Sequence, residues 1–187
     1  DVIPERIESN VYTFFYASTP DCHKNFETLC EASRLLEREI GTGKFKTVIT
    51  LSGSENRYSG WINANWGKVG SVELAGFMSK ERLYGNYASA DCFVFPSKVE
   101  TWGLPITEFM EVSPDKPMLL ADLPYAHETA GGARKACFFN PSDPEELKER
   151  MKEMIENKYS VLSPVPNPHI EEPRADSWKE LFEILLG

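Results

Sequence analysis

The sequence predicts an α/β fold, a Rossmann-like open parallel sheet of about six strands with helices on both faces. Short, continuous apolar runs alternate along the chain with segments whose apolar residues recur at helical spacing, as expected for buried strands that helices cover on both sides. The chain has 187 residues, of which 41% are hydrophobic and 26% charged, values that suit one folded globular domain. We therefore treat residues 1–187 as a single domain.

Six apolar runs are the predicted strands, and each has the length of a strand that crosses a sheet once. They lie at residues 11–17, 47–51, 72–76, 92–95, 118–121 and 136–139. Because amphipathic segments separate these runs, the strands are expected to be parallel and joined by helices.

Amphipathic segments between and after the strands predict the helices. The segment 143–157 is the clearest, because Asp143 is a suitable N-cap and Pro144 suits the first helical position. Residues 163–173 contain four prolines and are predicted to form an extended connector to a C-terminal helix. The predicted helices lie at residues 25–40, 80–90, from about 104 onward, 143–157 and about 178–186.

The charge distribution argues against two classes of partner. The chain carries 20 basic and 29 acidic residues and a net charge of −9, whereas nucleic acids and anionic membranes bind clustered basic surfaces. No apolar run approaches the roughly 20 residues of a membrane span, and the N-terminus does not resemble a secretory leader. We therefore expect no nucleic-acid partner and no transmembrane segment. Because the sequence does not start with Met, we expect it to be part of a longer protein.

Cysteine and histidine usage predicts neither a zinc site nor a disulfide framework. The four cysteines show no Cys-x-x-Cys spacing, and the chain has three histidines. Reduced thiols in structural positions indicate a cytoplasmic protein. We interpret His23 and His127 as polar surface or loop residues rather than catalytic groups.

The segment after the fourth predicted strand concentrates the candidate binding chemistry. A loop at residues 96–103 leads into a helix that starts near Leu104, with Pro105 in its first turn. In an open α/β sheet, ligands bind beyond the carboxyl ends of the strands. The amide groups and positive dipole end of this helix would form an anion site without a basic residue. Gly103 would let the backbone approach the ligand closely.

Two carboxylates, Glu100 in the loop and Glu108 about one turn into the helix, bracket this predicted anion site. A carboxylate can accept two hydroxyl hydrogen bonds, so the pair could bind the vicinal diols of a ribose and a hexose. From these residues alone, the alternative is that Glu100 is a loop charge and Glu108 a solvated helix residue.

The same segment resembles a family signature. It reads Phe-Pro-Ser-x-x-Glu-x-Trp-Gly-Leu-Pro-x-x-Glu over residues 95–108 and is similar to the Glu-x7-Glu motif of retaining GT-B glycosyltransferases, family 4 and its relatives. Further segments resemble the family in the same order along the chain, so the matches span about residues 10–157. They lie at residues 23–25, 76–79, 122–129 and 139–147.

This resemblance implies a donor-binding site. Glu108 would bind the nucleotide ribose, and Lys24 would bind the phosphates together with the start of the helix. Glu100 would be the catalytic residue beside the donor sugar, where it could stabilise the charge of an oxocarbenium-like transition state. The turn at residues 76–79 would contact the base, through the backbone of Met78 with Phe77 beside it. The implied donor-binding residues are Lys24, Phe77, Met78, Trp102, Gly103, Leu104, Pro105 and Glu108.

The chain departs from the family at one position, because Ser18 stands where an Arg is common. Phosphate binding would then depend on Lys24 and the helix start, or on another residue such as Arg57. Several assignments also have a structural alternative. Lys24 could be an exposed residue ahead of a helix, Phe77 a core residue, and Trp102 a packing anchor for the loop.

The resemblance implies the C-terminal, donor-binding half of a two-domain GT-B enzyme that uses a UDP- or GDP-sugar without a cofactor or metal ion. The acceptor would bind to an N-terminal domain of the same full-length chain, and the isolated fragment would be inactive. Such relatives usually act in bacterial surface-polysaccharide assembly, so we expect a cytoplasmic enzyme, with or without contact to the inner face of the membrane.

Two alternatives to this function remain open at the level of sequence. One is a GT-B relative with another reaction, such as an epimerase or a phosphorylase. The other is a noncatalytic nucleotide-binding or partner-docking module. Side chains of Glu100 and Glu108 that point away from one cleft would favour the docking module.

Overall fold

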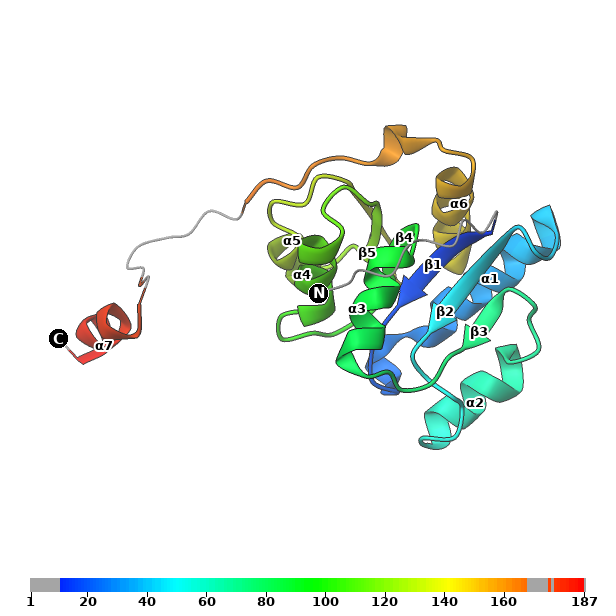
Figure 1. Cartoon of the computed structure of the whole chain (residues 1–187), viewed down its shortest axis with the longest axis horizontal. Helices are drawn as coiled ribbons and strands as arrows, with labels where there is room; N and C mark the ends of the chain where they lie inside the picture. Colours follow the sequence, from blue (N-terminus) through cyan, green and yellow to red (C-terminus); the bar gives the residue numbers. More distant parts are fainter. Residues whose placement is uncertain (1–10, 168–174, 176, 187) are drawn as a thin grey trace.

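Six parallel strands form the centre of the protein, shown as a computed structural model in Figure 1. The structure describes residues 11–167, 175 and 177–186. The strand order β3-β2-β1-β4-β5-β6 is that of a doubly wound sheet, and it confirms the predicted fold class. The strands are β1 (Tyr12–Tyr16), β2 (Phe45–Ile49), β3 (Val72–Leu74), β4 (Cys92–Phe95), β5 (Met118–Ala121) and β6 (Ala136–Phe139).

The observed strands correspond to the predicted ones, and the last three have the predicted bounds. The first strand is one residue shorter at each end. β2 starts two residues earlier than predicted because Phe45 pairs with Tyr12 of β1. β3 ends at Leu74, two residues earlier than predicted, because its pairing with β2 stops there and Gly76 turns the chain with a φ of 70°.

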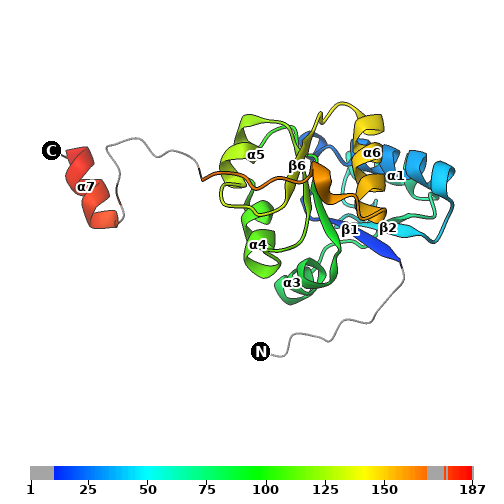
Figure 2. The same cartoon turned by 90° about the horizontal axis from the view of Figure 1, so that it is seen from above.

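Helices cover both faces of the sheet. In Figure 2, α3, α4 and α5 lie on one side, whereas α1 and α6 pack together on the other. The loops that follow the strands therefore meet at one edge of the sheet, between the two helical layers. The helices are α1 (Phe26–Ile40), α2 (Arg57–Trp66), α3 (Lys80–Ser89), α4 (Leu104–Val112), α5 (Pro124–Thr129), α6 (Pro144–Ile155) and α7 (Trp178–Leu186), with 3₁₀ turns at η1 (Cys22–Lys24) and η2 (Tyr159–Val161).

Two helices, α2 and α5, are absent from the sequence-based prediction. α2 mixes Tyr58, Trp61 and Ile62 with Ser, Gly and Asn residues, which lower helix propensity and obscure the period. Its start is fixed by Asn56, whose side chain accepts a hydrogen bond from the Ser59 backbone N–H at 2.9 Å in a capping box. α5 has six residues, too few to show a helical period.

Aromatic side chains fill the core between the sheet and the layer of α3 and α4. Tyr87 of α3 is fully buried. Its ring meets Phe15, Phe93 and Phe109 edge-on, with centroid distances of 5.6, 5.8 and 5.9 Å. Because edge-to-face contacts are geometrically specific, they hold the Tyr87 ring in one orientation, with its hydroxyl group directed toward Glu108 on α4.

The C-terminal segment starts against the sheet. Ser163 forms an antiparallel bridge with Ala136 of β6, so the predicted connector begins as a paired segment, and its residues 168–173 lie outside the described part. α7 forms as predicted and buries none of its residues, and Figure 1 shows it apart from the α/β layers.

Within the described ranges, no helix combines the length and the apolar character that a bilayer crossing requires.

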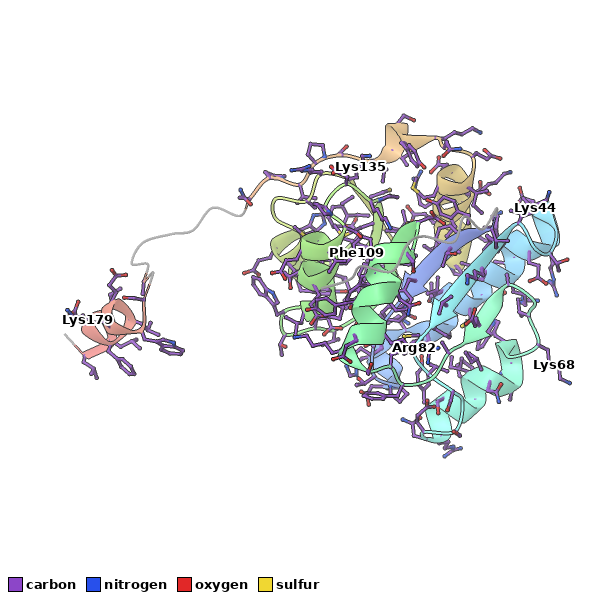
Figure 3. The ribbon with its side chains drawn as sticks, viewed as in Figure 1. Lys44, Lys68, Arg82, Phe109, Lys135 and Lys179 are labelled. Carbon is purple, nitrogen blue, oxygen red and sulfur yellow. The ribbon has the colours of Figure 1, made fainter. Side chains whose placement is uncertain are left out.

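Basic side chains are spread over the surface. Lys44, Lys68, Lys135 and Lys179 lie in separate parts of the chain and extend outward around the molecule in Figure 3. Such a distribution does not produce the continuous positive field that attracts polyanions. An anionic ligand would therefore depend on a local site.

Candidate functional site

A cavity of about 450 Å³ opens where the loops after the strands meet. Its wall contains Ser18 after β1, Thr50 after β2 and the segment after β4, so it occupies the edge at which doubly wound sheets bind ligands. We call it the strand-end cavity. It brings together the catalytic and donor-binding residues predicted from the sequence, which are Lys24, Phe77, Met78, Glu100, Trp102, Gly103, Leu104, Pro105 and Glu108.

The start of α4 forms one wall of this cavity. Gly103 precedes the helix with a φ of 88°, a left-handed conformation that favours glycine. A Cβ atom at this position would approach Ile106 Cδ1 to 3.3 Å and the Tyr125 ring to 3.6 Å. A hydrogen bond from the Thr129 hydroxyl group to the Trp102 carbonyl fixes the preceding loop. The Leu104 backbone N–H and the positive dipole end of α4 therefore lie at the wall without a capping side chain. Pro105 has no N–H, and the Ile106 N–H donates to the Gly103 carbonyl at 2.9 Å.

Lys24 and Glu100 form an ion pair in the wall, with Nζ and Oε1 2.7 Å apart. Their side chains are 14% and 10% exposed, so the interpretation of Lys24 as an exposed residue is wrong. The Tyr16 hydroxyl group donates to the Lys24 carbonyl at 2.8 Å. The next residue, Asn25, is buried with a φ of 58°, and its amide donates to the Pro96 carbonyl at 2.8 Å. These bonds fix Lys24 relative to the loop after β4.

Glu108 extends from α4 to the same cavity. The buried Tyr87 hydroxyl group donates to its Oε2 atom at 3.2 Å. Burial, followed by the nearby Glu108 carboxylate, raises the pKa of Tyr87, so the phenol remains a hydrogen-bond donor at neutral pH. Because Glu100 and Glu108 line one cavity, the geometry argues against the partner-docking alternative.

The turn after β3 contributes another part of the wall. Met78 is 7% exposed, whereas Phe77 is 91% exposed, so the interpretation of Phe77 as a core residue is wrong. An exposed aromatic ring beside a cavity is available to stack on a planar ligand. Trp102 is 46% exposed, so its indole also keeps accessible surface while its backbone anchors the loop.

Lys24 is the one basic side chain in the cavity wall, as far as the chain is described. Ser18 lines the cavity, and its backbone N–H and carbonyl each form a 2.9 Å hydrogen bond with the Thr50 hydroxyl group. Arg57 is the exposed first residue of α2 and lies outside this wall. Of the two alternatives for phosphate binding, the geometry favours Lys24 together with the start of α4.

Tyr87 and Glu55 also line the cavity but are absent from the sequence-based prediction. Glu55 accepts hydrogen bonds from the backbone N–H groups of Ser52, Gly53 and Ser54 at 2.5, 3.0 and 3.1 Å. Burial raises the pKa of Glu55, but hydrogen bonds from the backbone of Ser52 and of Glu55 itself, and from the Ser52 and Ser59 side chains, outweigh burial and lower the pKa to about 2. The Glu55 contacts are local, whereas the contact of Tyr87 with Glu108 joins two helices, so no residue spacing indicates it.

A second cavity, of about 430 Å³, lies between α4 and α5. We call it the α4/α5 cavity. Its wall includes Trp102, which it shares with the strand-end cavity, together with Met110 and the exposed residues Glu111 and Glu128. These two hollows of similar size therefore share Trp102 in their walls.

Sequence comparison finds a family match along most of the chain. The family model described as glycosyl transferases group 1 matches residues 3–167. The chain is also 27% identical over 173 residues to the O-antigen chain mannosyltransferase B of Escherichia coli, a match that covers 89% of this chain and 38% of that protein. The chain thus spans well under half the length of this relative.

Solved structures share the fold. An α,α-trehalose-phosphate synthase (UDP-forming) from Burkholderia vietnamiensis matches with a TM-score of 0.62 at 13% identity, covering 78% of this chain and 37% of that chain. The corresponding synthase from Burkholderia xenovorans, in complex with glucose-6-phosphate, matches with a TM-score of 0.65 at 12% identity, covering 81% and 38%. At these identities the likeness concerns the fold, and it confirms the expected Rossmann-like half of a GT-B architecture.

Proposed function

Because the chain belongs to the glycosyl transferases of group 1, we propose that it is the nucleotide-sugar-binding domain of an enzyme that transfers a hexosyl group. The transfer would retain the anomeric configuration and need no metal ion. One observation carries the proposal: a single cavity combines the buried Lys24–Glu100 ion pair, the glycine-capped start of α4, and a Glu108 carboxylate held by Tyr87.

The nucleoside would bind between Glu108 and the turn after β3. The Glu108 carboxylate can accept hydrogen bonds from the two ribose hydroxyl groups, because the Tyr87 bond uses only part of its lone-pair capacity. That bond also orients the carboxylate before the ligand arrives. The base would lie against the backbone of Met78, with the exposed Phe77 ring available for stacking.

The diphosphate would bind between Lys24 and the start of α4. The ammonium group supplies a full positive charge, and the helix supplies the Leu104 backbone N–H and the positive end of its dipole. Gly103 has no side chain that would cover this N–H group. This combination would stabilise the diphosphate as it leaves, which is why the proposal needs no metal ion.

Glu100 would lie beside the donor sugar. As the bond between the anomeric carbon and the phosphate oxygen breaks, positive charge develops on the sugar ring and negative charge on the departing diphosphate. The Glu100 carboxylate would stabilise the first charge, while Lys24 and the helix start would stabilise the second. The sugar hydroxyl groups would donate to the same carboxylate and orient the ring.

The acceptor would bind to another domain of the full-length protein, which would close over the cavity and exclude water. The isolated 187-residue chain is therefore expected to bind the donor without transferring the sugar. The similarity to an O-antigen chain mannosyltransferase favours a mannosyl donor and a bacterial surface polysaccharide as the product. The full-length enzyme would then act in the cytoplasm, where sugar nucleotides are made.

Isothermal titration calorimetry with UDP and GDP tests the proposal. The wild-type chain should bind at least one of them, and Glu108→Ala should weaken that binding about 10- to 100-fold, because it removes a charged hydrogen-bond acceptor. Glu111→Ala is the matched control, since Glu111 lies three residues later on α4 in the other cavity. Equal binding by Glu108→Ala would contradict the proposed site, and so would failure of the wild-type chain to bind UDP, GDP and the corresponding nucleotide sugars.

A further inference from the structure

The charges of the strand-end cavity are unusual for a site that binds a diphosphate. Its described wall contains the carboxylates of Glu55, Glu100 and Glu108 but one ammonium group, that of Lys24. Of the ionised side chains in this wall, one attracts an entering polyanion and three repel it. The arrangement of these charges must therefore decide which phosphate compounds bind.

Lys24 is already neutralised before any ligand arrives. Its Nζ atom lies 2.7 Å from Glu100 Oε1, and both side chains are largely buried, so water screens the pair only weakly. The Tyr16 hydroxyl group and the Asn25 side chain hold the backbone around Lys24 in place beside the loop after β4. A phosphate group that binds the Lys24 ammonium group breaks the ion pair with Glu100. The largely buried Glu100 carboxylate then lies unpaired beside a new negative charge.

A nucleotide sugar and a nucleoside diphosphate meet this problem differently. The nucleotide sugar offers hydroxyl donors to Glu100, which replace the hydrogen bond lost from Lys24. The nucleoside diphosphate has no such donors at its terminal phosphate. It also carries an additional negative charge there at neutral pH, because the second ionisation of a phosphate monoester has a pKa of about 6. The repulsion from Glu100 therefore falls mainly on the nucleoside diphosphate.

We infer that Glu100 makes the cavity select the nucleotide sugar over the nucleoside diphosphate that remains after transfer. This inference rests on the proposed function and assigns Glu100 a second role, as a specificity-determining residue. The Lys24–Glu100 ion pair breaks when a ligand that binds Lys24 also donates hydrogen bonds to Glu100. After the sugar leaves, the pair re-forms, and its re-formation displaces the diphosphate product.

Calorimetric titrations with two matched pairs of probes, UDP with UDP-glucose and GDP with GDP-mannose, test this selectivity. For the pair that binds, the wild-type chain should have a lower Kd for the nucleotide sugar than for the diphosphate. Glu100→Gln removes the charge but keeps the size of the side chain. It should lower the ratio of the diphosphate Kd to the sugar-nucleotide Kd by about tenfold, mainly through tighter diphosphate binding.

Glu111→Gln is the control, because it removes an equal charge from α4 outside the strand-end cavity. It should leave the ratio unchanged. A folded Glu100→Gln variant with the wild-type ratio would overturn the inference while leaving the proposed function intact. The same holds if the wild-type chain binds the diphosphate more tightly, a result that does not depend on the stability of any variant. Failure of the wild-type chain to bind all four probes would overturn the proposed function as well.

Discussion

The strand-end cavity and the α4/α5 cavity have similar volumes, about 450 and 430 Å³, and both include Trp102. They differ in how their polar groups are held. In the strand-end cavity, Glu100 is paired with a buried Lys24, and a second carboxylate accepts a hydrogen bond from a buried tyrosine. In the α4/α5 cavity, Glu111 and Glu128 are exposed, and their side chains remain free to reorient in water.

This difference shows why a hollow of sufficient volume is not by itself a binding site. A ligand gains little from a polar group that must be ordered on binding, because the lost side-chain entropy offsets the new contact. A group that packing and hydrogen bonds have already ordered avoids that cost. The buried network behind the strand-end cavity therefore matters as much as the residues that would touch the donor.

The largest effect is expected from Asn25, which anchors the Lys24 side of that network. Its amide donates to the Pro96 and Pro141 carbonyls at 2.8 and 2.7 Å, and the Thr28 hydroxyl group donates to its Oδ1 atom. Asn25→Ala leaves buried polar groups unsatisfied and should lower the free energy of unfolding by about 3 kcal/mol. Thermal denaturation should show a melting temperature lower by roughly 10 °C.

Asn157→Ala provides the matched control, because Asn157 also has a positive φ, 56°, but is exposed at the end of α6. It should cost about 1 kcal/mol for the left-handed backbone strain of alanine, and little more for the exposed hydrogen bond that the Tyr159 hydroxyl group donates to Asn157. Equal losses in the two variants would show that backbone conformation, rather than the buried hydrogen bonds of Asn25, explains the effect. The contrast drawn between the two cavities would then lose one of its supports.

A smaller change in stability but a clear change in binding is expected at Gly103. Alanine there must adopt a φ of 88° and place its methyl group 3.3 Å from Ile106 Cδ1, which costs about 1 to 2 kcal/mol of unfolding free energy. Because relief of this strain would shift the first amide groups of α4, Gly103→Ala should also weaken nucleotide binding at least about tenfold. Calorimetry and thermal denaturation measure the two effects separately.

Gly85→Ala tests whether that response is specific to the helix start. Gly85 lies inside α3, and a Cβ atom there would meet nothing within 4 Å. Alanine should therefore stabilise the helix by about 0.5 to 1 kcal/mol and leave nucleotide binding unchanged. If Gly103→Ala bound nucleotide as well as Gly85→Ala does, the start of α4 would not be the phosphate site.

Sequence patterns predict the sheet and the members of the site better than they predict the contacts between them. β4, β5 and β6 are continuous apolar runs, so their bounds follow from composition. The site residues follow from a motif and its order along the chain. The Tyr87–Glu108 hydrogen bond joins residues 21 positions apart on two helices, and no local period encodes it.

The structure also decides between alternatives that sequence patterns leave open. An aromatic residue in a loop is compatible with burial or exposure, and only packing shows that Phe77 is 91% exposed. Likewise, a Lys before a helix is usually solvated, whereas the Lys24 side chain is only 14% exposed because it pairs with Glu100 in a loop 76 residues away. Charge burial of this kind depends on tertiary pairing.

The smallest effect is expected from Glu128 in the α4/α5 cavity. Glu128→Gln removes the charge of an exposed side chain, so the free energy of unfolding should stay within about 0.5 kcal/mol of wild type. Nucleotide affinity should also be unchanged within about twofold, because exposed charges beyond the cavity are screened by salt. Thermal denaturation measures the stability, and titration calorimetry at low and at physiological ionic strength measures the affinity. A clear change in affinity at both salt concentrations would mean that Trp102 couples the two cavities, and that the α4/α5 cavity contributes to the donor site despite its unordered carboxylates.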